Sequence, residues 1–458
     1  MALVETFSGI RGEYEKELTE EIIKRYGYSF FLYLKENVGD GRKLKIVIGR
    51  DSRPSSLLVK NFLLEVLDCE IIDVGMLGTP LIENAVRDFG CDGGVIITAS
   101  HNEPGDNGFK FLDKNGEILD SSSMEFLINK KNEIRIDDFK VSLDNQSVRD
   151  SKNEAVNYYK EFVKKIIGEG VFGKNKILVD PNGGSGIISK EIFEDYNINA
   201  EYINMNEGEF VRLVEPTLKS MSYLVEKIKK GLFDFAIGFD CDADRVEIIL
   251  KNGELVSGNH VLAIITDYIL SKSPKGSSVV CNDATSYNVK EIVEKNKGNF
   301  VEVEVGETNV INKMQELKSP IGGEGSNGGI IIPPSTCRDG ILTTIYLLKI
   351  LNERGKSLIE ILKEIPEYFY FKEKIKLKDD FSNIRDKLIK YYKEKEFIIS
   401  LSGGETGGIK VINNGDGSWV WFRQSKTEDK ILRIISDSKD EKVAVNLLNE
   451  AKSVFDSI

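Results

Sequence analysis

FDFAIGFDCDADR, residues 233–245, runs from a short apolar segment directly into three alternating aspartates. An apolar run of this length is typical of a buried strand. Two other segments have the same plan, IITASHN at 96–102 and PIGGEGSNG at 320–328. In open α/β sheets, ligands bind at the carboxyl ends of the strands, so we expect these three loops to line one cleft.

Strand-like and helix-like segments alternate along the chain. Leu44–Gly49 and Gly93–Thr98 are expected as strands, and Ser55–Leu67 as an amphipathic helix between them. This alternation predicts parallel α/β layers, whereas the β-rich pattern after Glu367 predicts a small α+β domain. The predicted fold class is therefore α/β, with three similar mixed α/β domains and a C-terminal α+β domain. The predicted domains are 1–150, 151–255, 256–366 and 367–458.

The composition limits the classes of function. Of the 458 residues, 30% are charged and 41% are hydrophobic, which is typical of a soluble globular protein. The net charge of −12 excludes a general attraction for nucleic acid or for an anionic membrane. The sequence has no apolar secretory signal and no run long enough to span a bilayer, and its five widely spaced cysteines fit reduced thiols. We expect a cytoplasmic protein that holds any anionic substrate with a local group of basic side chains.

The first chemical motif is the cluster of Asp240, Asp242 and Asp244. Closely spaced carboxylates repel one another, and a hard divalent cation such as Mg²⁺ offsets that repulsion. Arg245 adds a fixed positive charge that suits a phosphate. A solvated acidic turn is the alternative interpretation. The apolar segment before the cluster favours the metal site.

The second motif is TASHNEPGDNGFK, residues 98–110, in which Ser100 follows a predicted strand. A serine in such a loop is positioned for chemistry, and His101 and Lys110 could move protons. The G-x-S-x-G pattern of an acyl-transfer hydrolase is absent. Taken alone, a loop serine is most often a turn former.

Three further loops carry charged groups among glycines. Arg11 lies in SGIRG, and Arg50 and Arg53 lie in GRDSR. The segment RQSKTE at 423–428 combines guanidinium, ammonium and hydroxyl donors, which suit a phosphate. Glu324 in GGEGSNGG could accept the hydroxyl groups of a sugar. Each of these loops taken alone could equally be a solvated turn.

Together these motifs resemble the α-D-phosphohexomutases, the family of phosphomannomutase/phosphoglucomutase and phosphoglucosamine mutase. TASHN…NGFK is similar to the phosphoserine loop of that family, DCDADR to its metal loop, GEGSNG to its sugar loop and RQSKTE to its phosphate loop. The four motifs occur in the family's order across nearly the whole chain. Further matches are SGIRG at Arg11, GRDSR at Arg50, DPNGGSG at Asp180, and Arg338-Asp339-Gly340.

The resemblance implies a role for each matching position. Ser100 would carry the phosphoryl group. The implied catalytic residues are Ser100, His101, Lys110, Arg11 and Arg245. The implied metal ligands are Ser100, Asp240, Asp242 and Asp244. The implied substrate-binding residues are Glu324, Ser326, Asn327, Arg423, Ser425, Lys426 and Thr427.

The resemblance also implies an activity and a shape. The chain would be an intramolecular phosphotransferase, an isomerase that interconverts hexose 1-phosphate and hexose 6-phosphate through a phosphoserine and a hexose 1,6-bisphosphate. Mg²⁺ would be the cofactor and the bisphosphate the activator. Four domains would form a heart shape around a central cleft. The partner would be a small phosphosugar, with no nucleic acid or membrane, and the protein would be a monomer or a homodimer.

Alternatives remain at this point. One is a phosphoglucosamine mutase, another is a Mg²⁺-dependent sugar phosphatase with Asp240 as nucleophile, and a third is a non-catalytic sugar-phosphate binder. The family's sugar loop commonly ends in a histidine, but Asn327 and Gly328 stand here, which leaves the choice among glucose, mannose and glucosamine open. Gln424 and Asp429 replace common prolines, and the negative charge of Asp429 would either weaken phosphate binding or make the loop more mobile.

Overall fold

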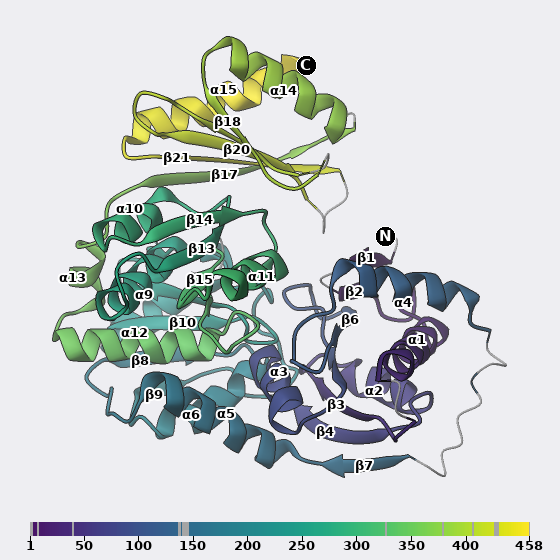
Figure 1. Ribbon diagram of the computed structural model, residues 1–458. Coiled ribbons are helices and arrows are strands. Elements are labelled where there is room, and N and C mark those ends of the chain that lie inside the picture. Colours follow the sequence, from purple (N-terminus) through teal and green to yellow (C-terminus); the bar gives the residue numbers. More distant parts are fainter. Residues whose placement is uncertain are drawn as a thin grey trace. The chain divides into compact units, whose positions relative to one another are not determined.

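The computed structural model describes residues 3–6, 9–38, 41–135, 139, 146–325, 328–377, 380–404, 407–425 and 430–457. Within those residues the strands form four sheets, which are flanked by helices (Figure 1). By their packing the elements divide into two compact units, Met1–Val256 with Gly329–Gly355, and Ser257–Gly328 with Lys356–Ile458. The predicted fold class is confirmed, while the four domain boundaries stay predictions. None of the helices in the described part of the chain is long and apolar enough to cross a membrane.

The first sheet has seven strands among the described residues. In spatial order they are β1 (Val4–Thr6), β2 (Gly9–Glu13), β6 (Asp106–Leu112), β5 (Gly93–Ile97), β3 (Lys45–Arg50), β4 (Glu70–Met76) and β7 (Ser147–Asp150). The strands expected at 44–49 and 93–98 are confirmed as β3 and β5. Parallel pairing joins β5, β3, β4 and β7 as predicted, while β6 runs antiparallel to β5. The two strands are joined by a loop without a crossover helix, and a parallel neighbour would need such a crossover.

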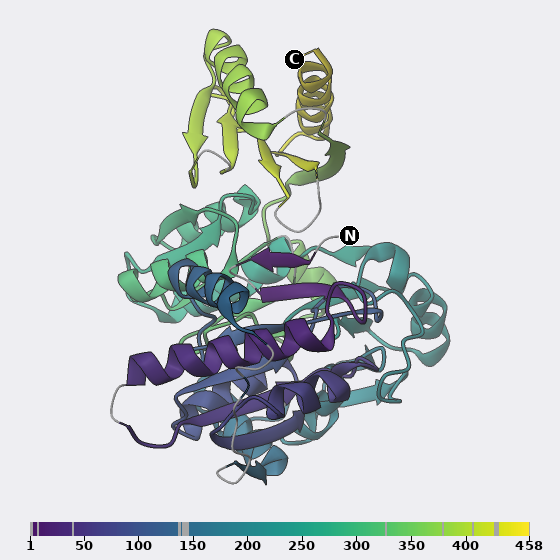
Figure 2. The ribbon, with the colours of Figure 1, turned by 90° about the vertical axis from the view of Figure 1, so that its right-hand side faces the viewer.

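Helices cover this sheet because their apolar residues recur at helical spacing. They are α1 (Glu20–Val38), α2 (Ser56–Leu64), α3 (Thr79–Asp88), α4 (Ser121–Glu133) and α5 (Lys152–Ile167). Ile23, Tyr26 and Phe30 of α1 are fully buried in one core with Phe109 and Phe111 of β6. Figure 2 looks onto α1, which lies along the sheet. The apolar face of α1 therefore fixes β6, the strand that leaves the Ser100 loop.

The second sheet centres on β10, whose five residues are all buried. In spatial order its strands are β12 (Leu255–Val256), β11 (Val246–Leu250), β10 (Phe235–Phe239), β8 (Lys176–Asp180) and β9 (Asn199–Tyr202). The other elements of the first unit are the 3₁₀ helix η3 (Ser185–Ile188), α6 (Ser189–Glu194), α7 (Leu218–Met221), α8 (Leu224–Gly231), the short strand β16 (Ile330–Ile331) and α12 (Gly340–Arg354). β10 and β8 are parallel, and β10 ends directly before Asp240. The aspartate cluster thus begins at the carboxyl end of a buried central strand.

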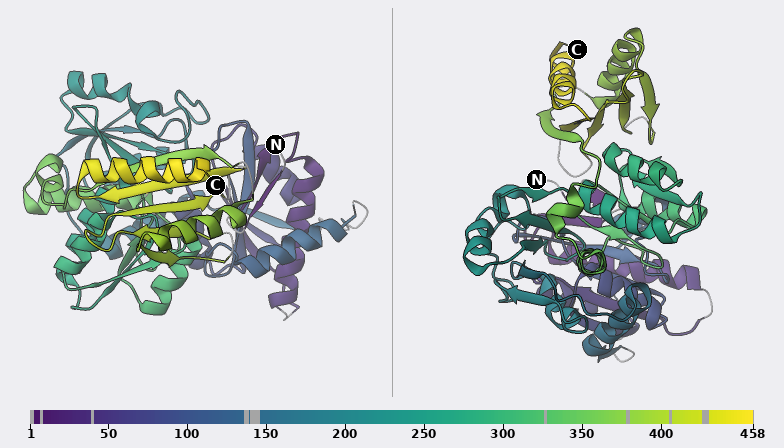
Figure 3. Two further views of the ribbon diagram at one scale, coloured as in Figure 1. Left: turned by 90° about the horizontal axis from the view of Figure 1, so that it is seen from above. Right: turned by 90° about the vertical axis from the view of Figure 1, so that its left-hand side faces the viewer.

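The second unit contains a parallel and an antiparallel sheet. The parallel part orders β14 (Asn299–Val303), β13 (Ser278–Asn282) and β15 (Ile321–Gly323), with α9 (Gly258–Lys272), α10 (Tyr287–Lys295), α11 (Glu307–Leu317) and α13 (Leu358–Leu362). The antiparallel sheet orders β17 (Phe369–Lys376), β21 (Ile431–Ser438), β20 (Trp419–Gln424), β19 (Ile409–Ile412) and β18 (Ile398–Leu401). Two helices, α14 (Phe381–Glu394) and α15 (Glu441–Ser457), cover one face of that sheet (Figure 3).

A buried lysine joins these two sheets. Lys410 of β19 is 1% exposed and pairs with Glu302 of β14. Its ammonium lies 4.0 Å from the ring centroid of Trp419 and 4.3 Å from that of Tyr287. Burial lowers the pKa of Lys410. The contact holds the antiparallel sheet on the parallel one through a charge that has little access to water.

Replacing Lys410 by methionine keeps most of the side-chain volume but leaves Glu302 without its cation. We expect Lys410→Met to lower the free energy of unfolding by about 2 kcal/mol, because removing one partner of a buried pair leaves a poorly solvated charge. Urea unfolding followed by fluorescence measures this. The control is Lys395→Met in the exposed pair with Glu450, expected within about 0.5 kcal/mol of the parent. Equal losses in the two variants would contradict the assigned role of Lys410.

Candidate active site

The Ser100 loop lies beside the aspartate loop within the first unit. Ser100 follows β5 and is 4% exposed. Its φ of 52° is in the left-handed region, which is strained for a serine. The Nη2 of Arg245 lies 3.4 Å from Ser100 Oγ and donates to it. One guanidinium therefore joins the serine to the loop that follows β10.

Three buried carboxylates form the acidic centre. Asp240, Asp242 and Asp244 each offer one oxygen, and these oxygens lie within 4.8 Å of one another. The carboxylates are 0–1% exposed. Within the described residues, Oδ1 of Asp242 and Oδ1 of Asp244 accept no hydrogen bond. Buried oxygens that converge in this way suit a divalent metal ion.

Basic side chains hold the other oxygen of each carboxylate. Arg245 Nε donates to Asp240 Oδ2 at 2.8 Å. Lys110 Nζ donates to Asp242 Oδ2 at 2.9 Å, and Arg338 Nη2 donates to Asp244 Oδ2 at 2.8 Å. One oxygen of each carboxylate is therefore held by a basic side chain. The donor set therefore fits a hard cation such as Mg²⁺ bound through single oxygens.

The electrostatics of the cluster also fit a cation. Burial, together with the charge of Asp244, raises the pKa of Asp240 well above its usual value. Burial also acts on Asp244, but Arg338, Lys110 and Arg245 outweigh it and lower the pKa of Asp244. A divalent ion among the carboxylates would stabilise the ionised form of Asp240.

Arg11 supplies a positive charge that no described residue neutralises by contact. It is half-buried on β2, and its guanidinium makes no hydrogen bond or ion pair within the described residues. Burial lowers its pKa, while the nearby charge of Asp242 opposes this shift. Gly108 allows the approach of β2, because a Cβ there would lie 1.9 Å from the carbonyl oxygen of Ile10. An incompletely compensated guanidinium near Asp242 and Asp244 is suited to an anion.

The two acid/base candidates differ in their surroundings. His101 is half-buried, and burial, with Arg245 and Arg11 nearby, lowers the pKa of His101 well below its usual value. The imidazole is therefore neutral at pH 7 and able to accept a proton. Lys110 is buried and donates to Asp242 and to Thr79 Oγ1, at 3.2 Å for the latter.

The remaining predicted site residues belong to the second unit. Glu324 Oε1 accepts hydrogen bonds from Asn282 Nδ2 and from the amide of Gly306, both at 3.0 Å. Arg423 Nη2 pairs with Glu304 Oε1 at 2.8 Å, so this predicted phosphate ligand already has a carboxylate partner. The amide of Ser425 donates to the carbonyl of Ile431. Four predicted substrate-binding residues lie outside the described residues: Ser326, Asn327, Lys426 and Thr427.

Sequence reasoning missed or underrated several contacts of the first unit. Thr79 begins α3, and both its amide and its hydroxyl bond to Asp242, at 2.9 and 2.6 Å. Arg338 was only a supporting family match, yet it holds Asp244. Glu215 lies 3.6 Å from Arg245 Nη1. The G-T-P helix start at Gly78 was a local signal for a helix N-terminus, but no signal indicated its partner.

Comparisons with known proteins identify the family. The model "Phosphoglucomutase/phosphomannomutase, alpha/beta/alpha domain I" matches residues 5–135, and the corresponding domain III model matches residues 257–369. A phosphoglucomutase/phosphomannomutase of Thermococcus kodakarensis is 32% identical over 97% of this chain and 98% of that protein. The chain belongs to the α-D-phosphohexomutase family. The resemblance found in the sequence is thereby confirmed, and with it the enzyme class, an intramolecular phosphotransferase.

Other members of the family show its range. A phosphoglucosamine/phosphogalactosamine mutase of Sulfurisphaera tokodaii is 30% identical over 98% of both chains. The crystal structure of a phosphoglucomutase/phosphomannomutase family protein from Burkholderia thailandensis has a TM-score of 0.82 at 20% identity, covering 100% of this chain and 98% of that one. This last likeness concerns the fold alone. The phosphohexomutase fold therefore extends along the whole chain.

The acidic centre predicts how this phosphohexomutase responds to metal. Asp242→Asn removes one negative charge and one converging oxygen, so we expect Mg²⁺ affinity to fall more than about tenfold. Isothermal titration calorimetry measures the affinity, and the rise in Tm on adding Mg²⁺ gives an independent measure. Asp195→Asn, in an exposed pair with Lys160, is the control and should bind as the parent does. An unchanged affinity in Asp242→Asn would exclude this carboxylate as a ligand.

Proposed function

We propose that this phosphohexomutase interconverts hexose 1-phosphates and hexose 6-phosphates by way of a phosphorylated Ser100 and a hexose 1,6-bisphosphate. The observation that carries the proposal is the bridge formed by Arg245, which contacts Ser100 Oγ and Asp240 together. A phosphoryl group on Ser100 would lie beside that guanidinium and the acidic centre. Phosphoryl transfer depends mainly on such positioning and charge stabilisation.

The first half-reaction moves the phosphoryl group to the sugar. The bond between Ser100 Oγ and phosphorus breaks as the free sugar hydroxyl forms its bond to phosphorus, and the bisphosphate results. Mg²⁺ bound by Asp240, Asp242 and Asp244 with a phosphoserine oxygen would supply charge neutralisation. Arg245 and Arg11 supply the fixed positive charges on the protein side.

Proton transfer is assigned to His101. In the first half-reaction its neutral imidazole can accept the proton of the attacking sugar hydroxyl and deliver it to the departing Ser100 Oγ. In the second half-reaction it can accept the proton of the attacking Ser100 hydroxyl and deliver it to the departing sugar oxygen. Lys110 is committed to Asp242 and Thr79, so its main role in the proposal is to hold the acidic centre. After the bisphosphate has turned around, its other phosphate returns to Ser100. Hexose 1,6-bisphosphate would also phosphorylate Ser100 in enzyme that has lost its phosphate.

The second unit would hold the sugar and the non-reacting phosphate. Glu324 is fixed by two donors and would accept sugar hydroxyls, together with Ser326 and Asn327. Arg423, Ser425, Lys426 and Thr427 would bind the phosphate, and Arg423 would then exchange or share its contact with Glu304. The preferred sugar is open, since relatives act on different hexose phosphates by their names. A coupled assay with the 1-phosphates of glucose, mannose and glucosamine would determine it.

The phosphatase alternative with Asp240 as nucleophile would leave the Ser100 loop and the phosphate loop without a role. Asp240 Oδ2 accepts from Arg245 Nε, and its Oδ1 accepts from the Arg245 amide at 3.2 Å. The same Arg245 donates to Ser100 Oγ, which places the serine at the acidic centre and favours the mutase.

Loss of the Ser100 hydroxyl tests the proposal directly. We expect Ser100→Ala to lower kcat by at least about 1,000-fold, because the covalent carrier of the phosphoryl group is gone. Intact-mass spectrometry should find one phosphate on the parent protein and none on the variant. Ser453→Ala, at an exposed serine of α15, should keep both the activity and the phosphate. Full turnover in Ser100→Ala would refute the phosphoserine mechanism.

Charge balance predicts that metal binding depends on the phosphate. Arg11, Lys110, Arg245 and Arg338 lie around the three carboxylates, and Glu215 adds a further carboxylate 3.6 Å from Arg245, so the charges of the unphosphorylated site already offset one another. A phosphoserine adds about two negative charges. We expect the phosphoenzyme to bind Mg²⁺ about tenfold or more tightly than the same protein after phosphatase treatment, measured by calorimetry.

The control for this comparison is Ser100→Ala incubated with hexose 1,6-bisphosphate, from which free bisphosphate is then removed. Its Mg²⁺ affinity should match that of the dephosphorylated parent. Equal affinities for the phosphorylated and dephosphorylated parent would show that the charge of the phosphoserine does not control metal binding.

A further inference from the structure

Arg53 lies under the Ser100 loop and is almost completely buried. Its guanidinium belongs to the GRDSR segment after β3, which taken alone could be a solvated turn. It is 1% exposed, and its side chain has no exposed surface. The interpretation as a solvated turn is therefore wrong for Arg53.

Every N–H group of this guanidinium is in use. Nη2 donates to the carbonyls of Ser100 and Asn102, both at 2.6 Å. Nη1 donates to the carbonyls of Glu103 and Asp106, at 2.6 and 2.9 Å, and Nε donates to Asp51 Oδ2 at 2.9 Å. A guanidinium has five N–H donors, so none remains for a ligand.

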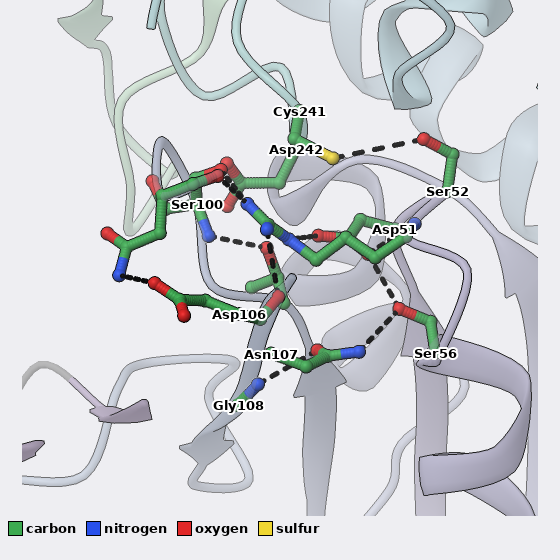
Figure 4. A network of polar contacts seen from close by, with 12 residues as sticks. Asp51, Ser52, Ser56, Ser100, Asp106, Asn107, Gly108, Cys241 and Asp242 are labelled. Carbon is green, nitrogen blue, oxygen red and sulfur yellow. Dashed lines mark hydrogen bonds and ion pairs between the residues drawn. The ribbon is translucent and has the colours of Figure 1, made fainter. Parts of the chain in front are cut away.

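Asp51, which accepts the hydrogen bond from Arg53 Nε, is itself held by other residues. Asp51 is fully buried, and its Oδ1 accepts from the amide of Arg53 at 3.0 Å and from Ser56 Oγ at 2.7 Å. Asn107 Nδ2 in turn donates to Ser56 Oγ at 3.1 Å (Figure 4). Asp51 and Ser56 lie outside the loop that the guanidinium holds. The loop is therefore fastened to the end of β3 and to the start of α2.

The same network reaches the metal loop. Ser52, the neighbour of Arg53, has its Oγ 3.8 Å from the Sγ of Cys241, which stands between Asp240 and Asp242 (Figure 4). Arg53 thus ties the serine loop to the same segment, residues 51–56, that contacts the acidic loop. A shift of this segment would move both loops.

The hydrogen bonds of Arg53 matter because Ser100 has an unfavourable backbone conformation. A left-handed φ is unfavourable for serine and persists only when surrounding contacts enforce it. Arg53 binds the carbonyl of Ser100 itself and the carbonyls of residues two, three and six positions on. These bonds fix the backbone on the C-terminal side of the serine, and the amide of Ser100 is held by Thr98 Oγ1 at 2.8 Å on the other side.

We infer that Arg53 is a positioning residue for phosphoryl transfer, which holds Ser100 in its strained conformation so that Oγ faces Arg245 and the acidic centre. The inference rests on the proposed function. In a mutase the same Oγ must lose a phosphoryl group and later receive one from the other end of the sugar. The loop therefore has to keep one geometry in both half-reactions, and a saturated guanidinium provides it without contacting the substrate.

The test is Arg53→Lys, which keeps the charge but cannot make five directed hydrogen bonds. We expect kcat to fall about 100-fold with KM within about twofold of the parent, because a small displacement of the reacting atom slows transfer without weakening sugar binding. Hydrogen exchange should accelerate at residues 100–106. A raised KM with unchanged kcat would make Arg53 a binding residue and overturn the inference, and so would unchanged kinetics.

Two further variants, Arg42→Lys and Ser56→Ala, make the result for Arg53→Lys unambiguous. Arg42→Lys, in an exposed pair with Asp92 far from Ser100 in sequence, is the matched control and should leave kcat unchanged. If Arg53→Lys does not fold, Ser56→Ala removes one hydrogen bond to Asp51, and a fall in kcat at constant KM is again expected. A normal kcat in Ser56→Ala with faster exchange at 100–106 would overturn the inference.

Different results would contradict the proposed function and the positioning role of Arg53. If the parent protein shows no mutase turnover and carries no phosphate on Ser100 by intact mass, the proposed function is wrong. If the parent turns over and is phosphorylated but Arg53→Lys keeps its kcat, only the role of Arg53 is wrong. Phosphate content measured on each variant therefore assigns any failure to one of the two.

Discussion

Three buried carboxylates within five residues are the constraint on which the first unit depends. Asp240, Asp242 and Asp244 would repel one another strongly without compensation. The compensating groups come from β6, from the acidic loop itself, from α3 and from the segment before α12. Segments distant in sequence must therefore meet at the end of β10. The order of the strands brings this about, because β5 and β10 both end at their loops in the same region of the unit.

Buried arginines shape the loops around this centre. Arg212 resembles Arg53, since its Nε donates to Asp180 Oδ2 at 2.7 Å and its other nitrogens donate to carbonyls, among them that of Phe239. Phe239 directly precedes the acidic loop. Both arginines pair with an aspartate at the end of a strand and donate to carbonyls of the neighbouring loops and strand ends. Irregular backbone can thus be buried beside a highly charged site.

The features that could be predicted from the sequence are those formed by residues close together in the chain. The D-x-D-x-D cluster and the serine loop were found because their residues are neighbours in the chain and follow apolar strands. Thr79 was not found and Arg338 was found only as a family match, since each contacts the acidic loop from a distant segment. The burial of Arg53 was not predicted either, because the loop that covers it is distant in sequence. The antiparallel β6 and the pair between Arg423 and Glu304 also depend on tertiary contacts, which propensity does not encode.

The buried contact at Lys410 has a consequence for biosynthesis. The parallel sheet of the second unit leaves the ribosome before β19 and β20, so Glu302 and the side chain of Tyr287 are first made without the cation and the indole ring that cover them. Until the C-terminal strands arrive, the nascent chain presents an acidic and aromatic face to its surroundings.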